Sequence, residues 1–186
     1  MPKDINCMSG RCRFSSKILN DVKSFCVETK SVIELGCGCG KNLQALTFVS
    51  VKVGIDPFEP NIIAARSIVP EAKLYIDSHF KLKDFSRNEF DLGITCSVLD
   101  HIESFEVALD DLLRICKKLL LIEPMIEGEN RQALISETTC PSDTWYFDYR
   151  KALLDRKVKF IIEKTPLYKK NSGPLYHTIF ANCEDK

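Results

Sequence analysis

The stretch IELGCGCGKN (residues 33–42) places three glycines at alternate positions directly after an apolar run. Gly36, Gly38 and Gly40 follow the segment SVIEL (31–35), whose composition is typical of a buried strand. Glycine is favoured where the backbone turns with a positive φ, or where another group must approach the backbone closely. We therefore expect a ligand to lie against the backbone at the end of this strand.

Strand-like and helix-like patterns alternate along the first two thirds of the chain. Helical spacing of apolar residues occurs at 14–26, from 41 onward, at 59–68 and at 104–117. Short apolar runs typical of buried strands lie at 31–35, 51–56, 73–77, 90–96 and 118–124. This alternation predicts a parallel sheet with helices on both faces. Such sheets bind ligands outside the carboxyl ends of their strands, which is where the glycines stand.

The last part of the chain has a different pattern. After a polar stretch (125–144), the segment TWYFDYRKALLDR (144–156) predicts a helix. The two final apolar runs, 158–164 and 175–183, are joined by a loop without a helical pattern. Because strands joined without a crossover helix pair antiparallel, we expect an antiparallel strand pair near the C-terminus.

The composition limits the class of protein and its partners. A chain of 186 residues with 45% hydrophobic residues fits one globular domain. Its 26 basic and 26 acidic side chains balance, which does not favour nucleic acid as a partner. No apolar run approaches the length of a membrane span, and the N-terminus lacks the apolar centre of a secretory signal. We therefore expect a cytoplasmic protein with no membrane partner.

Nine cysteines are scattered along the chain. In a reducing compartment such residues act mostly as small hydrophobic side chains. The spacings C-x-C, at Cys37 and Cys39, and C-x4-C, at Cys7 and Cys12, differ from those of a usual zinc-binding pair. The sequence therefore predicts no metal site.

Three carboxylates stand at the ends of the first three expected strands: Glu34, Asp56 and Asp77. In a parallel sheet these ends lie along one edge, so the three acceptors suit a ligand with an amine or hydroxyl groups. An acidic residue about 20 positions after a glycine loop is the usual acceptor for a ribose diol. The sequence thus predicts a ligand that contains a nucleoside.

The glycine spacing excludes two common phosphate-binding loops. A dinucleotide site needs G-x-G-x-x-G, and the third glycine position is occupied by Lys41 or Leu43, depending on the frame. A P-loop needs G-x-x-x-x-G-K-[ST], whereas Lys41 is followed by Asn42. We therefore expect a nucleoside-like ligand that is not held by a pyrophosphate.

Four segments in order resemble the successive motifs of class I S-adenosylmethionine-dependent methyltransferases: VIELGCGCG, VGIDPFEPNI, YIDS and FDLGITCSVLDHI. The resemblance covers about residues 31–124. It implies an α/β, three-layer, Rossmann-like fold with a mostly parallel seven-stranded sheet and a C-terminal antiparallel strand pair. It also implies S-adenosyl-L-methionine as cofactor and S-adenosyl-L-homocysteine as product.

The resemblance further implies a division of one domain, residues 1–186, into three parts. These are an N-terminal helical segment (1–30), a cofactor-binding core (31–124), and an acceptor-side loop, helix and terminal strand pair (125–186).

By the same resemblance, the residues that bind the cofactor follow the first four strands. They are Glu34, Gly36, Gly38, Gly40, Asp56, Pro57, Phe58, Asp77, Ser78, Cys96 and Ser97. The glycines would give room to the methionine part of the cofactor. Glu34 would accept from its ammonium group, Asp56 from the ribose hydroxyls and Asp77 from the adenine amino group. Cys96 and Ser97 would border the sulfonium. Each residue type also has a structural alternative: a tight turn for the glycines, a turn or helix-start acceptor for the aspartates, and a core position for the phenylalanine.

Methyl transfer from a sulfonium depends mainly on alignment, and it needs a base only if the acceptor is protonated. His101, in SVLDHIES, is the candidate base, with Asp100 and Glu103 nearby; the alternative is a structural histidine at the start of a helix. Three aromatic residues could form a wall over the acceptor or the buried face of a helix: Trp145, Tyr146 and Tyr149. Further candidates for acceptor or cofactor contacts are Arg11 and Arg13.

The expected acceptor is a small molecule, for example one with a hydroxyl group. The place after the fourth strand reads TCSV, which lacks the Asn/Asp-Pro-Pro-aromatic run and the Pro-Cys pair of base-modifying enzymes. Two alternatives remain at this point: a non-catalytic cofactor-binding subunit that regulates or scaffolds a partner, and a methyltransferase that acts on RNA or protein. The oligomeric state does not follow from the sequence.

Overall fold

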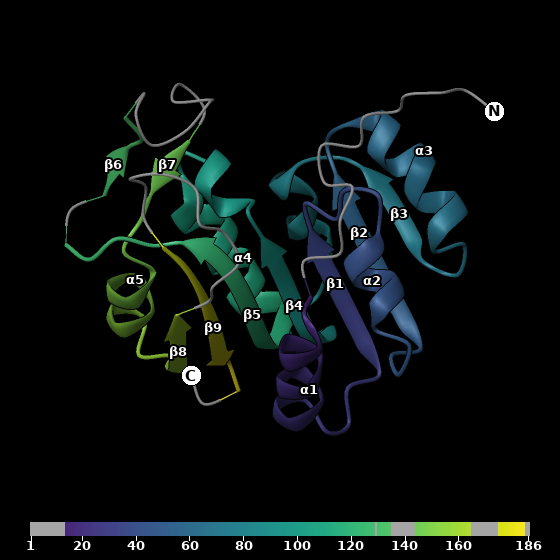
Figure 1. Cartoon of the computed structure of the whole chain (residues 1–186), viewed down its shortest axis with the longest axis horizontal. Helices are drawn as coiled ribbons and strands as arrows, with labels where there is room; N and C mark the ends of the chain where they lie inside the picture. The colour runs from purple at the N-terminus through teal and green to yellow at the C-terminus, as the bar shows by residue number, and fades with distance from the viewer. Residues whose placement is uncertain (1–13, 129, 135–143, 165–174, 185–186) are drawn as a thin grey trace.

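The computed structural model describes residues 14–128, 130–134, 144–164 and 175–184. Its centre is a seven-stranded sheet with the strand order β3-β2-β1-β4-β5-β9-β8 (Figure 1). The strands are β1 (Ser31–Leu35), β2 (Val51–Asp56), β3 (Lys73–Ile76), β4 (Phe90–Cys96), β5 (Cys116–Pro124), β8 (Lys159–Lys164) and β9 (Tyr176–Asn182).

The strand directions agree with the sequence prediction. The strands β3, β2, β1, β4 and β5 are parallel. The last strand, β9, lies between β5 and β8 and pairs antiparallel with both. From β1 the chain winds outward through β2 to β3, and then returns to the other side of β1 with β4. The winding therefore reverses between β1 and β4, where sheets of this kind bind ligands.

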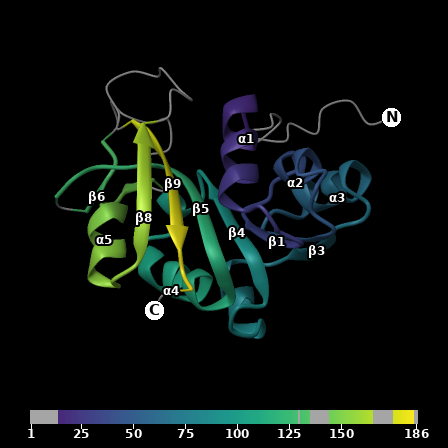
Figure 2. The same ribbon diagram turned by 90° about the horizontal axis from the view of Figure 1, so that it is seen from below.

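Helices cover both faces of the sheet (Figure 2). One face carries α1 (Ser16–Phe25), α2 (Lys41–Ala45) and α3 (Glu59–Ile68), and the other carries α4 (Phe105–Ile115) and α5 (Tyr149–Asp155). The alternation of side chains along β1 divides the core accordingly, since Ile33 packs with the α4 and α5 side and Val32 with the α1 to α3 side. The predicted three-layer fold is confirmed.

Among the described residues, no helix has the length and the apolar character needed to cross a membrane.

The segment 144–156 differs from its prediction as one helix. Trp145–Tyr146 forms the short strand β7, which pairs antiparallel with β6 (Arg131–Gln132), and α5 begins only at Tyr149. Asp148 sets this start, because its carboxylate accepts hydrogen bonds from the backbone N–H groups of Lys151 (2.8 Å) and Gly128 (2.8 Å). The helical spacing of the aromatic residues was a misleading signal, since a capping residue in the middle of the run separates strand from helix.

Two short 3-10 helices complete the edge that carries the carboxyl ends of the strands. They are η1 (His79–Asp84), which follows β3, and η2 (Leu99–His101), which follows β4. The sequence analysis did not predict either, because segments this short have no clear periodicity.

At the opposite edge of the sheet, Asp91 connects three strands. One carboxylate oxygen accepts from the backbone N–H groups of Lys30 (2.9 Å) and Ser31 (3.0 Å), and the other accepts from the Lys117 ammonium group (2.7 Å). Burial alone would raise the pKa of Asp91, but the lysine and the N–H donors outweigh it and lower this pKa to about 2.

This pKa leads to a prediction about acid stability. The folded pKa of Asp91 lies below that of an unfolded aspartate, so its carboxylate stabilises the fold above about pH 4, and this contribution is lost as the pH falls toward about 2. We expect Asp91→Asn to lower the free energy of unfolding by about 1–2 kcal/mol near pH 7, and the difference from wild type to shrink below about pH 4.

Urea unfolding at several pH values measures this difference. Asp110→Asn is the matched control, because Asp110 pairs with Arg156 on the exposed surface. A difference between wild type and Asp91→Asn that stays constant from pH 7 to pH 3 would contradict the assignment.

Candidate functional site

A pocket of about 800 Å³ opens at the edge of the sheet where the winding reverses. Its lining comes from the segments that follow β1, β2, β3 and β4, and from the start of α4. Eight of the residues proposed from the sequence line it: Gly36, Gly38, Asp56, Pro57, Ser78, Cys96, Ser97 and His101. Glu34, Gly40, Phe58 and Asp77, which were also proposed, do not line it.

The glycine loop has a left-handed backbone, with φ of 68° at Gly36, 51° at Gly38 and 77° at Gly40. A side chain at Gly36 would meet the protein itself, because a Cβ atom there would lie 2.2 Å from Cγ2 of Val98. At Gly40 a Cβ atom would lie 2.7 Å from Cγ1 of Val69. These two glycines are therefore required by the fold, in addition to any room that a ligand needs.

Asp56 joins the glycine loop to the start of α3. Its Oδ2 accepts a hydrogen bond from the N–H of Gly38 (2.9 Å). Its Oδ1 accepts from the N–H of Phe58 (2.9 Å) and from the side-chain amide of Asn61 (3.1 Å). The carboxylate is almost completely buried, yet it lines the pocket, so it both organises the loops and faces the space between them.

Glu34 lies under the pocket instead of in its wall. Its side chain is fully buried, and its Oε1 accepts from the side-chain amide of Asn42 at 2.7 Å. The other oxygen has no hydrogen-bond partner among the described residues. Burial raises the pKa of Glu34 to about 8; the Asn42 hydrogen bond opposes this rise and the charge of Asp56 adds to it. Asn42, which was not proposed from the sequence as a site residue, lines the pocket in place of Glu34.

The segment after β3 forms the far end of the pocket through Ser78, His79 and Phe80. Asp77 is exposed, and one of its oxygens accepts from the N–H of Ser78 at 2.7 Å. The rings of His79 and Phe80 lie 4.2 Å apart, and Phe80 is 59% exposed. An apolar ring this open is available to contact a ligand.

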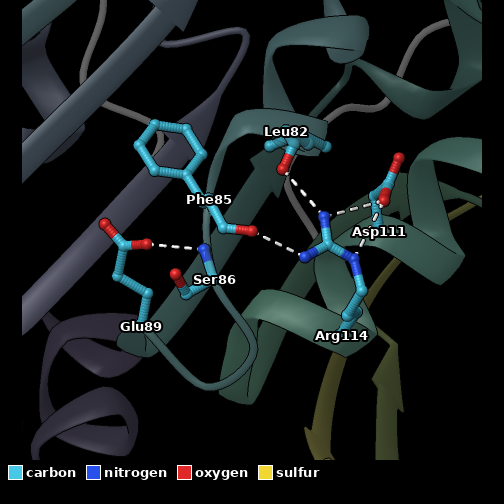
Figure 3. Close-up of polar contacts among 6 residues, drawn as sticks. All are labelled: Leu82, Phe85, Ser86, Glu89, Asp111 and Arg114. Carbon is cyan, nitrogen blue, oxygen red and sulfur yellow. Dashed lines mark hydrogen bonds and ion pairs between the residues drawn. The ribbon is translucent and has the colours of Figure 1, made fainter.

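Arg114 on α4 fixes this segment in place (Figure 3). Its guanidinium group donates to the backbone oxygens of Phe85 (2.6 Å) and Leu82 (3.0 Å). The same group is oriented by Asp111, one turn earlier on the helix, with a nitrogen 3.0 Å from the carboxylate. The position of η1, and with it this wall of the pocket, therefore depends on α4, the helix that joins β4 to β5.

The turn after β4 forms the opposite wall. Ser97 has a left-handed φ of 54°, its N–H donates to the backbone oxygen of Ile122 (3.0 Å), and its hydroxyl donates to the hydroxyl of Tyr176 (2.9 Å). His101 lines the pocket, its side chain is 51% exposed, and its Nε2 lies 3.9 Å from Oδ1 of Asp100. A half-exposed imidazole at this place is able to reach an acceptor molecule.

The described residues that line the pocket lie between Leu35 and Val107. Trp145, Tyr146 and Tyr149 are not among them; Trp145 stacks on Phe147, and the other two are buried. The alternative, the buried face of a helix, fits Tyr149, the first residue of α5, but not Trp145 and Tyr146, which form strand β7. Arg11 and Arg13 lie outside the described residues, and an acceptor-side role for 125–186 stays a prediction.

The contact between Gly36 and Val98 leads to a testable prediction. Gly36→Ala should lower the free energy of unfolding by about 2–5 kcal/mol, from a left-handed backbone and an overpacked Cβ atom. Val98→Ala in the same chain should restore part of this loss, because it removes the methyl groups that the new Cβ atom meets.

A double-mutant cycle by chemical denaturation measures the coupling between the two positions. Gly128→Ala serves as control for backbone strain, because Gly128 has a φ of 101° and a Cβ atom there meets nothing within 4 Å. The proposed clash would be rejected if Gly36→Ala lowered the free energy of unfolding by the same amount in the wild-type background and in the Val98→Ala background.

Residues 33–119 match the family model of the methyltransferase domain. No curated protein sequence matches the chain.

Several solved structures share the fold. The 1,6-didemethyltoxoflavin-N1-methyltransferase of Burkholderia thailandensis, solved with its namesake ligand and S-adenosylhomocysteine, has a TM-score of 0.68 at 13% identity, over 88% of this chain and 75% of that one. A SAM-dependent methyltransferase of Methanosarcina mazei has a TM-score of 0.65 at 17% identity, over 91% and 97%. A chain of the complex between the Haloferax volcanii Trm112 methyltransferase activator and a putative methyltransferase has a TM-score of 0.66 at 13% identity, over 87% and 88%.

At these identities the solved structures establish the fold, and the match to the family model adds the sequence motifs of residues 33–119. The chain therefore has the fold of the S-adenosylmethionine-dependent methyltransferases, and residues 33–119, just under half of its length, match the methyltransferase domain.

Proposed function

We propose that this protein transfers the methyl group of S-adenosyl-L-methionine to a small-molecule acceptor, such as one that carries a hydroxyl group. The observation that supports this most is the pocket itself, which runs from the glycine loop past Asp56 to His101. A volume of about 800 Å³ lies within the range of sites that enclose small ligands. The solved neighbour from Burkholderia thailandensis, with a small molecule and S-adenosylhomocysteine bound, supports the same class of reaction.

The hydrogen bonds of Asp56 support a contact between this carboxylate and a ribose. An ionised carboxylate offers about four acceptor positions, and the N–H of Gly38, the N–H of Phe58 and the amide of Asn61 use three of them. One position is left for a ribose hydroxyl. Asn61 also lines the pocket, so its amide is in place to contact the second hydroxyl.

With the ribose at Asp56, the adenine and the methionine part of the cofactor extend in opposite directions along the pocket. Adenine would lie beside residues 78–80, where Phe80 offers an exposed ring and Asp77 a carboxylate next to Ser78. The methionine part would lie along Gly36, Gly38 and Asn42, with the buried Glu34 holding Asn42 from behind. The sulfonium then faces Cys96, Ser97 and the space toward His101.

The chemical step is a displacement at the methyl carbon. The acceptor atom forms a bond to this carbon while the carbon–sulfur bond breaks, and its electron pair stays on the sulfur, which becomes an uncharged thioether. A hydroxyl acceptor loses its proton in the process, and His101 is the group in the pocket wall that we propose to accept it. Alignment of acceptor, carbon and sulfur supplies the rest of the rate.

Conversion of S-adenosyl-L-methionine to S-adenosyl-L-homocysteine with a panel of metabolites, RNA and protein acceptors tests the proposal. Turnover with a small hydroxyl compound is the expected result. Binding without turnover on any acceptor would instead favour a non-catalytic subunit that works with a partner. The Haloferax volcanii complex, which joins an activator to a putative methyltransferase, is the reason to include a partner protein in that case.

Asp56→Ala should weaken the binding of S-adenosyl-L-homocysteine by about 1.5–3 kcal/mol, the scale of a hydrogen bond to a charged group. Calorimetry measures the change, with circular dichroism to confirm that the variant is folded. Asp155→Ala is the control, since it removes an exposed carboxylate that pairs with Lys151 on α5 and does not line the pocket. Wild-type affinity in a folded Asp56→Ala protein would reduce Asp56 to a turn residue.

His101→Ala should lower turnover of a hydroxyl acceptor by about 100- to 10,000-fold, the usual contribution of a general base. Cofactor affinity should change little, because the imidazole faces the acceptor side of the pocket. Steady-state kinetics and calorimetry on the same preparation separate the two effects. Unchanged turnover with a proven hydroxyl acceptor would remove His101 from the mechanism and direct attention to Glu103, which also lines the pocket.

A further inference from the structure

Asn42, the second residue of α2, joins the pocket to a carboxyl group that is buried beneath it. The residue follows the glycine loop and lines the pocket, although it is only 8% exposed. Its side-chain nitrogen, Nδ2, donates to Oε1 of Glu34 at 2.7 Å. Glu34, in β1, is fully buried and does not line the pocket, so Asn42 lies between the carboxyl group and the pocket space.

The hydrogen bond to Glu34 fixes how the Asn42 amide is turned. A side-chain amide carries its donors on the nitrogen and its acceptor on the oxygen. Because the nitrogen is directed at the carboxyl group below, the oxygen Oδ1 is the polar end that remains for the pocket. The pocket therefore presents an acceptor at this place, directly after the glycine loop.

Glu34 has few contacts besides this one. Its second oxygen, Oε2, has no hydrogen-bond partner among the described residues. The positions beside Glu34 in the neighbouring strands are Gly54 in β2 and Ile94 in β4, so neither strand offers it a polar side chain there. Because a buried carboxyl group with so few partners is costly, its place under the pocket is explained by the orientation that it gives to Asn42.

The other buried carboxyl groups near the pocket serve other parts of it. Asp56 accepts from the glycine loop and from the start of α3. Glu123, near the end of β5, is fully buried, and its two oxygens accept from the backbone N–H of Val98, at 3.1 and 3.2 Å, in the wall after β4. The end of the pocket that follows the glycine loop is thus left to Asn42.

We propose that Oδ1 of Asn42 recognises the α-ammonium group of the cofactor, and that Glu34 acts behind it as a positioning residue. This inference rests on the proposed function, which places the methionine part along Gly36, Gly38 and Asn42. An ammonium group has three donors and no acceptor, so it is matched by the amide oxygen and not by the amide nitrogen. The contact makes the pocket select adenosine compounds that carry the amino group over those that lack it.

Calorimetry with S-adenosyl-L-homocysteine and with its deamino analogue, in which hydrogen replaces the amino group, measures this selection as a ratio of two affinities. Asn42→Leu keeps the approximate size of the side chain and removes the amide. We expect it to lower the ratio about 10- to 100-fold, the scale of a hydrogen bond to a charged group. The loss should come from weaker binding of S-adenosyl-L-homocysteine, with little change for the analogue.

Gln44→Leu is the matched control, because it removes an exposed amide from the same helix, outside the pocket, and should leave the ratio unchanged. Two variants of Glu34 test its positioning role. Glu34→Gln keeps an oxygen that can accept from Asn42 and should retain the selection, whereas Glu34→Leu removes it and should lower the ratio as Asn42→Leu does. A wild-type ratio in folded Glu34→Leu would overturn the positioning role.

If Asn42→Leu does not fold, Asn42→Ala removes the same amide with a smaller side chain. An unchanged ratio in a folded Asn42 variant overturns this inference and leaves the proposed function intact, and so does equal affinity of wild type for the two ligands. Failure of wild type to bind S-adenosyl-L-homocysteine overturns the proposed function, and this inference with it.

Discussion

The site depends on the carboxylate of Asp56, which accepts hydrogen bonds from two separate loops. It connects the N–H of Gly38, after β1, to the N–H of Phe58 and the amide of Asn61, at the start of α3. A buried carboxylate without these donors would be costly, and the donors would be costly without the carboxylate. The constraint fixes the glycine loop at the place where the sheet reverses its winding, so the pocket is formed largely by the fold before any ligand binds.

The carboxyl groups around the pocket differ in how deeply they are buried. Asp77 and Glu103 are exposed to solvent, Asp56 reaches the pocket from a nearly buried position, and Glu34 and Glu123 are fully buried behind the wall. The buried carboxyl groups are held by neutral donors of the chain, the Asn42 amide and the Val98 N–H, instead of by cations. Burial raises the pKa of both Glu34 and Glu123, so neither is a strong source of negative charge near pH 7.

The sequence was sufficient to predict the alternation of strands and helices, the parallel sheet and the antiparallel end, because hydrophobic periodicity is a local signal. It failed at residues 144–148, where the cap formed by Asp148 ends an aromatic run that has helical spacing. Glu34 was also proposed as a cofactor contact; its side chain is fully buried, accepts from Asn42 and does not line the pocket, and its role toward the cofactor stays a prediction. The roles of Val98, Arg114 and Glu123 depend on contacts with residues 25 or more positions away, and no local pattern encodes these.

A crystal structure of the protein with S-adenosyl-L-homocysteine tests the proposed binding mode most directly. We expect a ribose hydroxyl to contact Asp56, adenine to lie beside residues 78–80, and the sulfur to face Ser97. A nucleoside bound in the reverse direction, or outside this pocket, would contradict it.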